Sequence, residues 1–219
     1  LKLKDEPTYS DANSRRFGTY LQANYSYKDI YLFDIAGRYE GASSFGAKEK
    51  MGVFWSGGVG LNLHNYSFMK TYEWLDRFKV KATYGVTGKA NFSPYQARTT
   101  YDIMYDNPYI DQWGMVLKAL GNENLLWEKV KKFDLGVELA FLKSAVTVQF
   151  DYYRDMTTDQ VEDVSLPSSS GFTTYKDNVG KVLNKGFDVK LNVRAFSNRD
   201  WDVYVFANLN HNPNTIEEI

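Results

Sequence analysis

The sequence contains no cysteine among its 219 residues and only two histidines, His64 and His211. The absence of cysteine excludes disulfide frameworks, thiolate nucleophiles and cysteine-ligated zinc. The two histidines are far apart in the sequence and do not suggest a metal site or a general base. Asp102, Asp106 and Asp111 share one segment but lack the spacing and the glycine of a calcium-binding loop. We therefore expect no catalytic site, no metal and no cofactor.

The chain also lacks an excess of charge of one sign and any long hydrophobic run. Lys and Arg number 26 and Asp and Glu 27, which gives a net charge of −1. The densest basic group is Lys129, Lys131 and Lys132; it alternates with Val130 and Phe133, and we interpret it as the polar face of a strand rather than a nucleic-acid site. No stretch approaches the roughly 18 apolar residues that a membrane helix requires. Residence in a membrane would therefore require a β-barrel.

Apolar and polar residues alternate along much of the chain, which indicates β-strands with one apolar face. The pattern predicts six clear strands and two weaker ones: 30–40, 78–86, 133–141, 146–153, 187–194 and 201–210, then 15–27 and 51–63. These runs are longer than the roughly 5 or 6 residues of an average globular strand and approach the roughly 9 to 11 of a tilted membrane strand. We predict an all-β fold, an antiparallel meander of about eight long strands within a larger transmembrane β-barrel.

Proline and aromatic residues support the same prediction. The five prolines (Pro7, Pro94, Pro108, Pro167 and Pro213) all fall in the inferred connections, where no sheet hydrogen bond is lost. Aromatic residues make up 16% of the chain, and many Tyr and Trp residues lie near strand ends, as in the interfacial girdles of membrane barrels. The core of a soluble sandwich could use the same aromatics, so this observation alone leaves both folds open.

Short and long connections alternate along the predicted meander. Tight turns are expected at 28–29, 142–144 and 197–200, and 64–76 should contain a helical turn. Bacterial barrels have short periplasmic turns and long outer loops, so we expect 41–50, 88–126 and 157–178 to face outside. The predicted organisation is an incoming loop or strand end at 1–13, a barrel segment at 14–212 and a truncated end at 213–219.

The inferred loop 88–126 carries the candidate ligand contacts Tyr101, Tyr105, Tyr109 and Trp113. Aromatic rings stack on sugar faces and on peptide side chains, so these residues could bind either class of ligand. Packing of the loop on the barrel mouth would explain them equally well.

Polar residues of the predicted strands should form the inner wall of the barrel. Six charged side chains are expected to point into a hydrated lumen: Asp34, Arg38, Glu138, Asp151, Lys190 and Arg194. Asn178 and Asn184, near Gly180 and Gly186, are expected to hydrogen-bond nearby backbone in a structural role.

Five ordered segments resemble one family, the SusC/RagA-type TonB-dependent transporters of Bacteroidetes-like bacteria. The segments are NYSYKDIYLFDIAGRYEGASSF (24–45), RFKVKATYGVTGK (77–89), LGNENLLWEKVKKFDLGVE (120–138), DYYRDMTTD (151–159) and LPSSSGFTTYKDNVGKVLNKGFD (166–188). One departure is Glu123, where the family often has proline, and it should slightly loosen that turn.

The resemblance implies that the chain is the C-terminal barrel portion of a transporter with about 22 strands in the outer membrane. It also implies import of glycans or peptides, contact with membrane lipid, a SusD-like surface lipoprotein as partner, and coupling to the TonB complex through a plug segment that this chain does not contain. It implies neither an enzyme nor a nucleic-acid-binding protein.

Two other interpretations remain open from the sequence. A self-contained eight-stranded outer-membrane barrel, structural or adhesive, would pair its first strand with its last. A soluble carbohydrate-binding β-sandwich would pack two apolar sheet faces against each other.

Overall fold

The computed structural model describes residues 13–44, 50–89, 96–110 and 112–218. Its strands are β1 (Arg16–Tyr27), β2 (Tyr31–Ala42), β3 (Met51–Asn62), β4 (Leu75–Lys89), β5 (Thr100–Tyr109), β6 (Gln112–Ala119), β7 (Glu128–Phe141), β8 (Val146–Ser165), β9 (Thr174–Ser197), β10 (Asp202–His211) and β11 (Asn214–Glu218). Three short 3₁₀ helices complete it: η1 (Leu63–Asn65), η2 (Met69–Thr71) and η3 (Ser168–Ser170). No helix in these ranges is long and apolar enough to cross a membrane.

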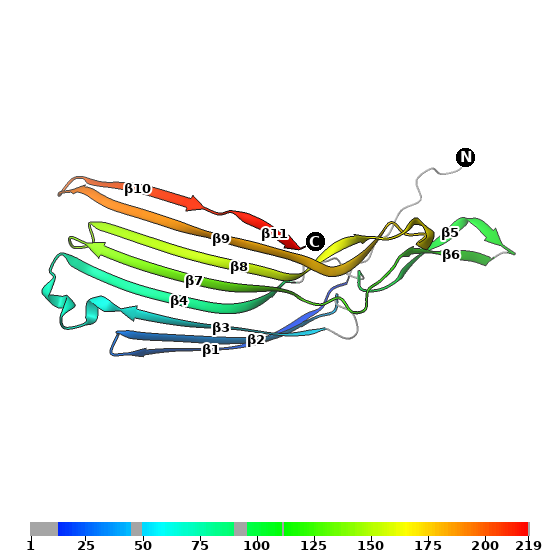
Figure 1. Ribbon diagram of the computed structural model, residues 1–219, viewed down its shortest axis with the longest axis horizontal. Coiled ribbons are helices and arrows are strands. Elements are labelled where there is room, and N and C mark those ends of the chain that lie inside the picture. Colours follow the sequence, from blue (N-terminus) through cyan, green and yellow to red (C-terminus); the bar gives the residue numbers. More distant parts are fainter. Residues whose placement is uncertain (1–12, 45–49, 90–95, 111, 219) are drawn as a thin grey trace.

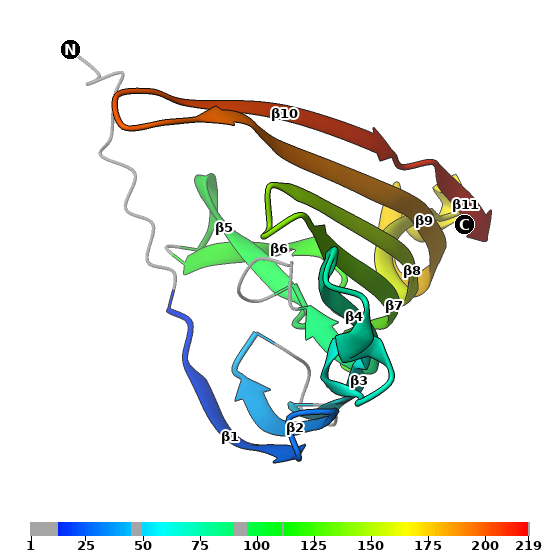
Figure 2. The same ribbon diagram turned by 90° about the vertical axis from the view of Figure 1, so that its left-hand side faces the viewer.

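One antiparallel sheet contains all the long strands, in the order β1-β2-β3-β4-β7-β8-β9-β10, and β11 continues beside β9 after β10 ends. Figure 1 shows the strands running nearly parallel to the long axis, with the tight turns at the left and the β5–β6 hairpin at the right. Viewed from the turn end, the sheet curves as an open arc with β1 and β10 at its two edges (Figure 2). The described strands thus form a curved wall, neither two packed sheets nor a closed eight-stranded barrel.

The eight strands predicted from alternation are confirmed, and the register explains why the pattern is so regular. Paired residues of neighbouring antiparallel strands lie on the same face. One row across the sheet is apolar throughout: Tyr27, Tyr31, Leu61, Val80, Val137, Phe150, Val189 and Leu209. The register places all six charged residues expected in the lumen on the opposite face. We call the two faces the outer and the inner face.

The tight turns have the backbone conformation that short hairpins need. Lys28 and Asp29 both have φ of 53°, and a two-residue type I′ turn requires positive φ at both central positions. Leu142, Lys143 and Ser144 also have positive φ, between 55° and 60°. At the β3–β4 turn, the hydroxyl of Tyr66 donates a hydrogen bond of 2.9 Å to the Tyr31 hydroxyl, and this bond raises the pKa of Tyr66.

Three of the ranges expected to be loops or a chain end contain strands. The range 88–126 is not a plain loop, because it contains the β5–β6 hairpin, in which Pro108 lies within a strand. The range 157–178 is largely strand, since β8 continues to Ser165 and β9 begins at Thr174. The end at 213–219 contains β11. In the 157–178 range both faces of the strands are polar, so no apolar alternation marked it as strand.

The interpretation of the lysine group at 129–132 also needs correction. Only Lys132 lies on the inner face, where it pairs with Asp155 in the β7–β8 register. Lys129 and Lys131 share the outer face with Phe133, because residues two apart in a strand point the same way. The group is therefore not one polar face.

The buried core lies where the sheet meets the long connections. Phe54 and Trp127 pack edge to face with ring centroids 5.4 Å apart, and Ala42 completes the cluster. Leu125 is completely buried nearby in sequence. The end of the connection between β6 and β7 thus supplies much of the apolar packing, whereas most large apolar side chains of the strands stay exposed.

The close approach of β9 and the end of β10 yields a test of packing. A Cβ added at Gly186 would overlap the backbone carbonyl oxygen of His211, whereas nothing lies within 4 Å of a Cβ added at Gly37. In the intact protein, Gly186→Ala should destabilise the barrel by about 1 to 3 kcal/mol, as overpacking does. Gly37→Ala should change stability by less than about 0.5 kcal/mol. Thermal unfolding in detergent, followed by the gel mobility of the folded barrel, measures both; equal melting temperatures would contradict the prediction.

Candidate functional site

The inner face of the sheet carries a lattice of paired charges. Lys81 of β4 lies 3.2 Å from Asp151 of β8 and 3.8 Å from Glu138 of β7. Lys132 and Asp155 form a second pair at 3.2 Å. These side chains remain partly exposed, so each pair contributes little stability and mainly keeps the wall hydrated and close to neutral. Such a surface suits the passage of polar molecules rather than their tight capture.

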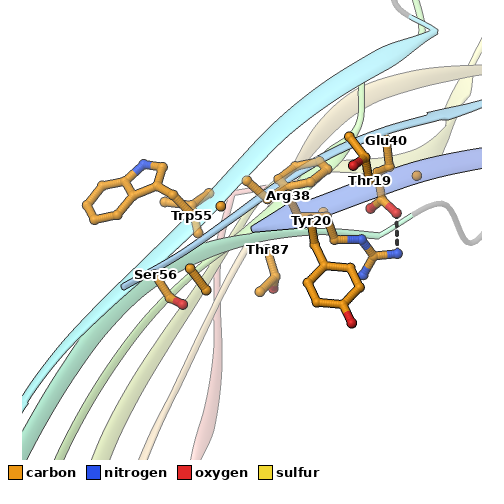
Figure 3. Close-up of a pocket in the computed structure, with 13 residues that line it drawn as sticks. Thr19, Tyr20, Arg38, Glu40, Trp55, Ser56 and Thr87 are labelled. Carbon is orange, nitrogen blue, oxygen red and sulfur yellow. Dashed lines mark ion pairs between the residues drawn. The ribbon is translucent and has the colours of Figure 1, made fainter. Parts of the chain in front are cut away.

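A shallow hollow of about 450 Å³ lies at one end of the sheet, over β1, β2, β3 and β4. Arg38 forms an ion pair with Glu40 two residues along the strand, and Figure 3 shows this pair near the Tyr20 ring. Tyr20 and Arg38 are partners in the β1–β2 register and so belong to the inner face. The hollow combines the aromatic residues Tyr20, Phe54 and Trp55 with hydrogen-bonding groups. One side of it is formed by β1, the edge strand of the sheet.

The segment from Leu120 to Glu128 is held by a buried polar network. Asn122, which is 4% exposed, donates through Nδ2 to the backbone oxygen of Lys176 at 3.0 Å and to Asp177 Oδ1 at 3.2 Å. The carboxylate of Glu128 accepts a hydrogen bond of 3.2 Å from the backbone N–H of Val161. These bonds tie the connection between β6 and β7 to the long arm formed by β8 and β9.

Asn178 is the centre of this network. Its Oδ1 accepts from the backbone N–H of Leu126 at 2.8 Å, and its Nδ2 donates to the carbonyl oxygens of Leu126 at 3.2 Å and Asp159 at 2.6 Å. Asp159 has φ of 59°, and the β8–β9 register shifts between Thr157 and Gln160. The predicted structural role of Asn178 is confirmed. Its side chain supplies a hydrogen bond to Asp159 where the regular backbone pairing of β8 and β9 is interrupted.

Asn184 does not follow the same prediction. Its Oδ1 is buried and has no hydrogen-bond partner among the described residues. The structure gives no physical reason for this orphaned acceptor.

The β5–β6 hairpin presents the predicted aromatic residues. Tyr105 and Trp113 meet edge to face with centroids 5.1 Å apart, and the register puts Tyr101, Ile103 and Met115 on the same face. Tyr101, Tyr105 and Trp113 are each about 60% exposed. The side chain of the fourth candidate, Tyr109, lies outside the described residues, although its backbone pairs with Gln112. The hairpin thus brings three of the four candidates to one exposed apolar face.

The opposite face of the hairpin carries an ion pair beside the apolar Met104 and Val116. Lys118 and Asp102 pair across the two strands at 2.9 Å, and both side chains are exposed. Asp102 is thus held in an ion pair, while the side chain of Asp106 and the whole of Asp111 lie outside the described residues.

At the foot of the hairpin, burial raises the pKa of Tyr175, and the charge of Asp177 adds to this rise.

The two histidines occupy structural positions. His64 Nδ1 lies 3.2 Å from the carbonyl oxygen of Phe78, at the turn between β3 and β4. The His211 ring lies 5.6 Å from the Phe187 ring across the β9–β10 pair. Within the described ranges, no three His, Asp or Glu side chains gather as metal ligands would.

Comparison with known proteins extends these observations. Residues 4–217 match the family model described as "TonB dependent receptor-like, beta-barrel". A TonB-dependent receptor of Formosa agariphila is 31% identical over 199 residues, which cover 90% of this chain and 20% of that receptor. The TonB-dependent receptor SusC of Bacteroides thetaiotaomicron is 27% identical, covering 96% of this chain and 22% of SusC. The chain therefore spans about a fifth of the length of these relatives.

Solved structures show the same similarity in three dimensions. The structure of the RagAB peptide transporter superposes with a TM-score of 0.87 at 28% identity, covering 94% of this chain and 22% of that one. The siderophore receptor PirA of Pseudomonas aeruginosa superposes with a TM-score of 0.63 at 17% identity, which shows the shared fold only.

The Asn178 network predicts a local loss of order on mutation. Asn178→Ala leaves the backbone groups of Leu126 and Asp159 without their side-chain partner, and an unsatisfied buried group costs about 1 to 3 kcal/mol. Hydrogen exchange in the intact protein should therefore be faster at the Leu126 amide and its neighbours. Asn192→Ala is the matched control, because the exposed Asn192 makes only one long bond, of 3.4 Å to Thr147. Equal exchange rates in the two variants would refute this role for Asn178.

Proposed function

This chain belongs to the TonB-dependent receptor-like β-barrel family, and from that membership we propose that it forms part of the wall and mouth of an importer for peptides or glycans. It is a barrel segment of an outer-membrane protein, and its relatives are transporters and receptors rather than enzymes. The observation that carries the proposal is the continuous curved sheet with one apolar and one hydrated, charge-paired face, which superposes on RagAB with a TM-score of 0.87.

In this proposal the inner face forms one side of the passage through the membrane. A lumen with alternating paired charges interacts weakly with many polar molecules, because each charge already has a partner. Lys81, Asp151 and Glu138 form such a group near the middle of the sheet. Selection of the cargo then falls to the outer end, where the hairpin lies.

The β5–β6 hairpin is the proposed contact with cargo. Tyr105 and Trp113 form a rigid, exposed aromatic corner, and their rings can stack on sugar rings or on peptide side chains. RagAB is a peptide transporter, and the similarity to it favours peptides as the first class to test.

The proposal includes two protein partners. A SusD-like surface lipoprotein would close over the outer mouth, next to the hairpin, and energy would reach the barrel from the TonB complex through a plug segment. Exposed aromatic residues are common in protein interfaces, so the same hairpin face can serve the lipoprotein when the mouth is closed.

Binding of defined probes tests the cargo. The intact protein is incubated separately with peptides from a casein hydrolysate and with maltooligosaccharides, and the retained molecules are identified by native mass spectrometry. Retention of peptides or oligosaccharides supports the importer, and retention of neither contradicts these cargo classes.

Variants test the role of the hairpin in the same assay. Loss of a stacking ring costs about 0.5 to 1.5 kcal/mol beyond the buried area, so Tyr105→Ala and Trp113→Ala should each weaken binding roughly three- to tenfold. Lys118→Gln, on the opposite face of the hairpin, is the control and should bind as the parent does. Parent-like binding by both alanine variants would remove the hairpin from the cargo site while leaving the importer itself intact.

A further inference from the structure

Three adjacent strands change from aromatic to basic along the outer face, within two neighbouring rows of the sheet. Towards the end opposite the tight turns, Phe133 of β7 is followed by Lys131, Tyr152 of β8 by Arg154, and Phe187 of β9 by Lys185. Residues two apart in a strand share a face, so these cations lie on the same face as the apolar rows. On each of these strands a positive charge therefore interrupts the apolar face.

The three cations are close to one another. Arg154 and Lys185 are direct partners in the β8–β9 register, and Lys131 is opposite Met156, one diagonal step from Arg154. Directly opposite residues have Cβ atoms about 4.5 to 5.5 Å apart and diagonal neighbours about 7 to 8 Å. Like charges at such separations destabilise a sheet unless an anion lies between them.

No acidic side chain of the described residues forms an ion pair with Lys131, Arg154 or Lys185, and all three are exposed. The adjacent inner-face Lys132 has Asp155 as its partner at 3.2 Å. Further out on the outer face, Lys181 pairs with Glu217 at 3.0 Å. The uncompensated charge is therefore confined to two neighbouring rows of the outer face.

This cluster is not a product of an open edge. β7 and β8 each have a neighbouring strand on both sides. At Lys185 the connection between β10 and β11 lies beside β9, and the carbonyl oxygen of Pro213 accepts a hydrogen bond of 3.3 Å from the Lys185 N–H. The cluster is also not part of a ring of charges around the whole sheet. In the register row of Lys131, β2, β3 and β4 carry the uncharged residues Gly37, Trp55 and Val86.

An apolar groove adjoins the cluster on the same face. It has a volume of about 540 Å³ and is lined by Tyr25, Phe33, Gly57, Ala82 and Phe133, among others. Phe133 pairs directly with Arg154, so the groove and the cations are continuous across one row of the sheet. Small residues such as Gly57 and Ala82 leave space that a hydrocarbon chain can fill.

We propose that Lys131, Arg154 and Lys185 bind the phosphate of an anionic lipid in the outer leaflet, with an acyl chain of that lipid in the adjoining groove. Bacterial barrels place short turns in the periplasm. The cluster is well removed from those turns, since Lys131 is near the start of β7 and Arg154 and Lys185 are near the middle of β8 and β9. Arg binds phosphate through two parallel hydrogen bonds and Lys as a compact charge, so the three together suit a phosphorylated headgroup. The proposal requires only that the barrel resides in a membrane, and it is independent of cargo.

Native mass spectrometry of the intact protein in detergent tests the site with bisphosphorylated lipid A as the probe. The triple variant Lys131→Gln, Arg154→Gln, Lys185→Gln should bind it at least about tenfold more weakly than the parent, because each basic residue near a membrane surface adds to anionic lipid binding. The control variant Lys190→Gln, Arg194→Gln removes two inner-face cations and should bind as the parent does. Phosphatidylcholine should bind weakly to all three proteins.

The possible outcomes separate the lipid from other sources of phosphate. Excess inorganic phosphate should leave the bound lipid in place; complete displacement would indicate a free-anion site and overturn the proposal. Equal retention of lipid A by the triple variant and the parent would also overturn it. If the triple variant does not fold, the single variants Arg154→Gln and Arg194→Gln are compared in the same assay, and only the first should weaken binding.

Discussion

The need to satisfy every backbone hydrogen bond away from water is the constraint on which this structure depends. In a bilayer a strand cannot leave its N–H and C=O groups unpaired, so strands must form long ladders with both neighbours. The β4–β7 and β7–β8 pairs keep their register over nearly their whole length for this reason. Once the ladder is fixed, side chains can only alternate, and one face must suit lipid while the other suits water.

This constraint also decides what could be predicted from the sequence. Within the membrane the two faces differ strongly, so alternation at 133–141 identified the strand and both of its faces. Beyond the membrane both faces meet water and the alternation disappears, which is why residues 157–165 of β8 and 174–178 of β9 were predicted as loop. The β5–β6 hairpin did carry a signal, since Tyr101, Ile103 and Tyr105 alternate with Asp102 and Met104, but its aromatic residues were interpreted as part of a loop.

Some parts of the candidate site could likewise be predicted from the sequence, and others could not. The aromatic face of the hairpin could be anticipated because Tyr105 and Trp113 are close in sequence and chemically distinctive. The structural role of Asn178 could also be anticipated, but its partner Leu126 could not, because Leu126 is 52 residues away in the sequence. The three outer-face cations could not be recognised as a group, because their proximity depends on the register that places Arg154 opposite Lys185.

The extension of β8 and β9 past the sheet has a mechanical consequence. With 20 and 24 residues, the two strands form an arm that is continuous with the barrel wall, and Asn178 fastens the neighbouring connection to it near Leu126. A force on the tip of this arm is transmitted along paired backbone rather than lost in a flexible linker. Such a force would reach the barrel wall through the irregular register between Thr157 and Gln160.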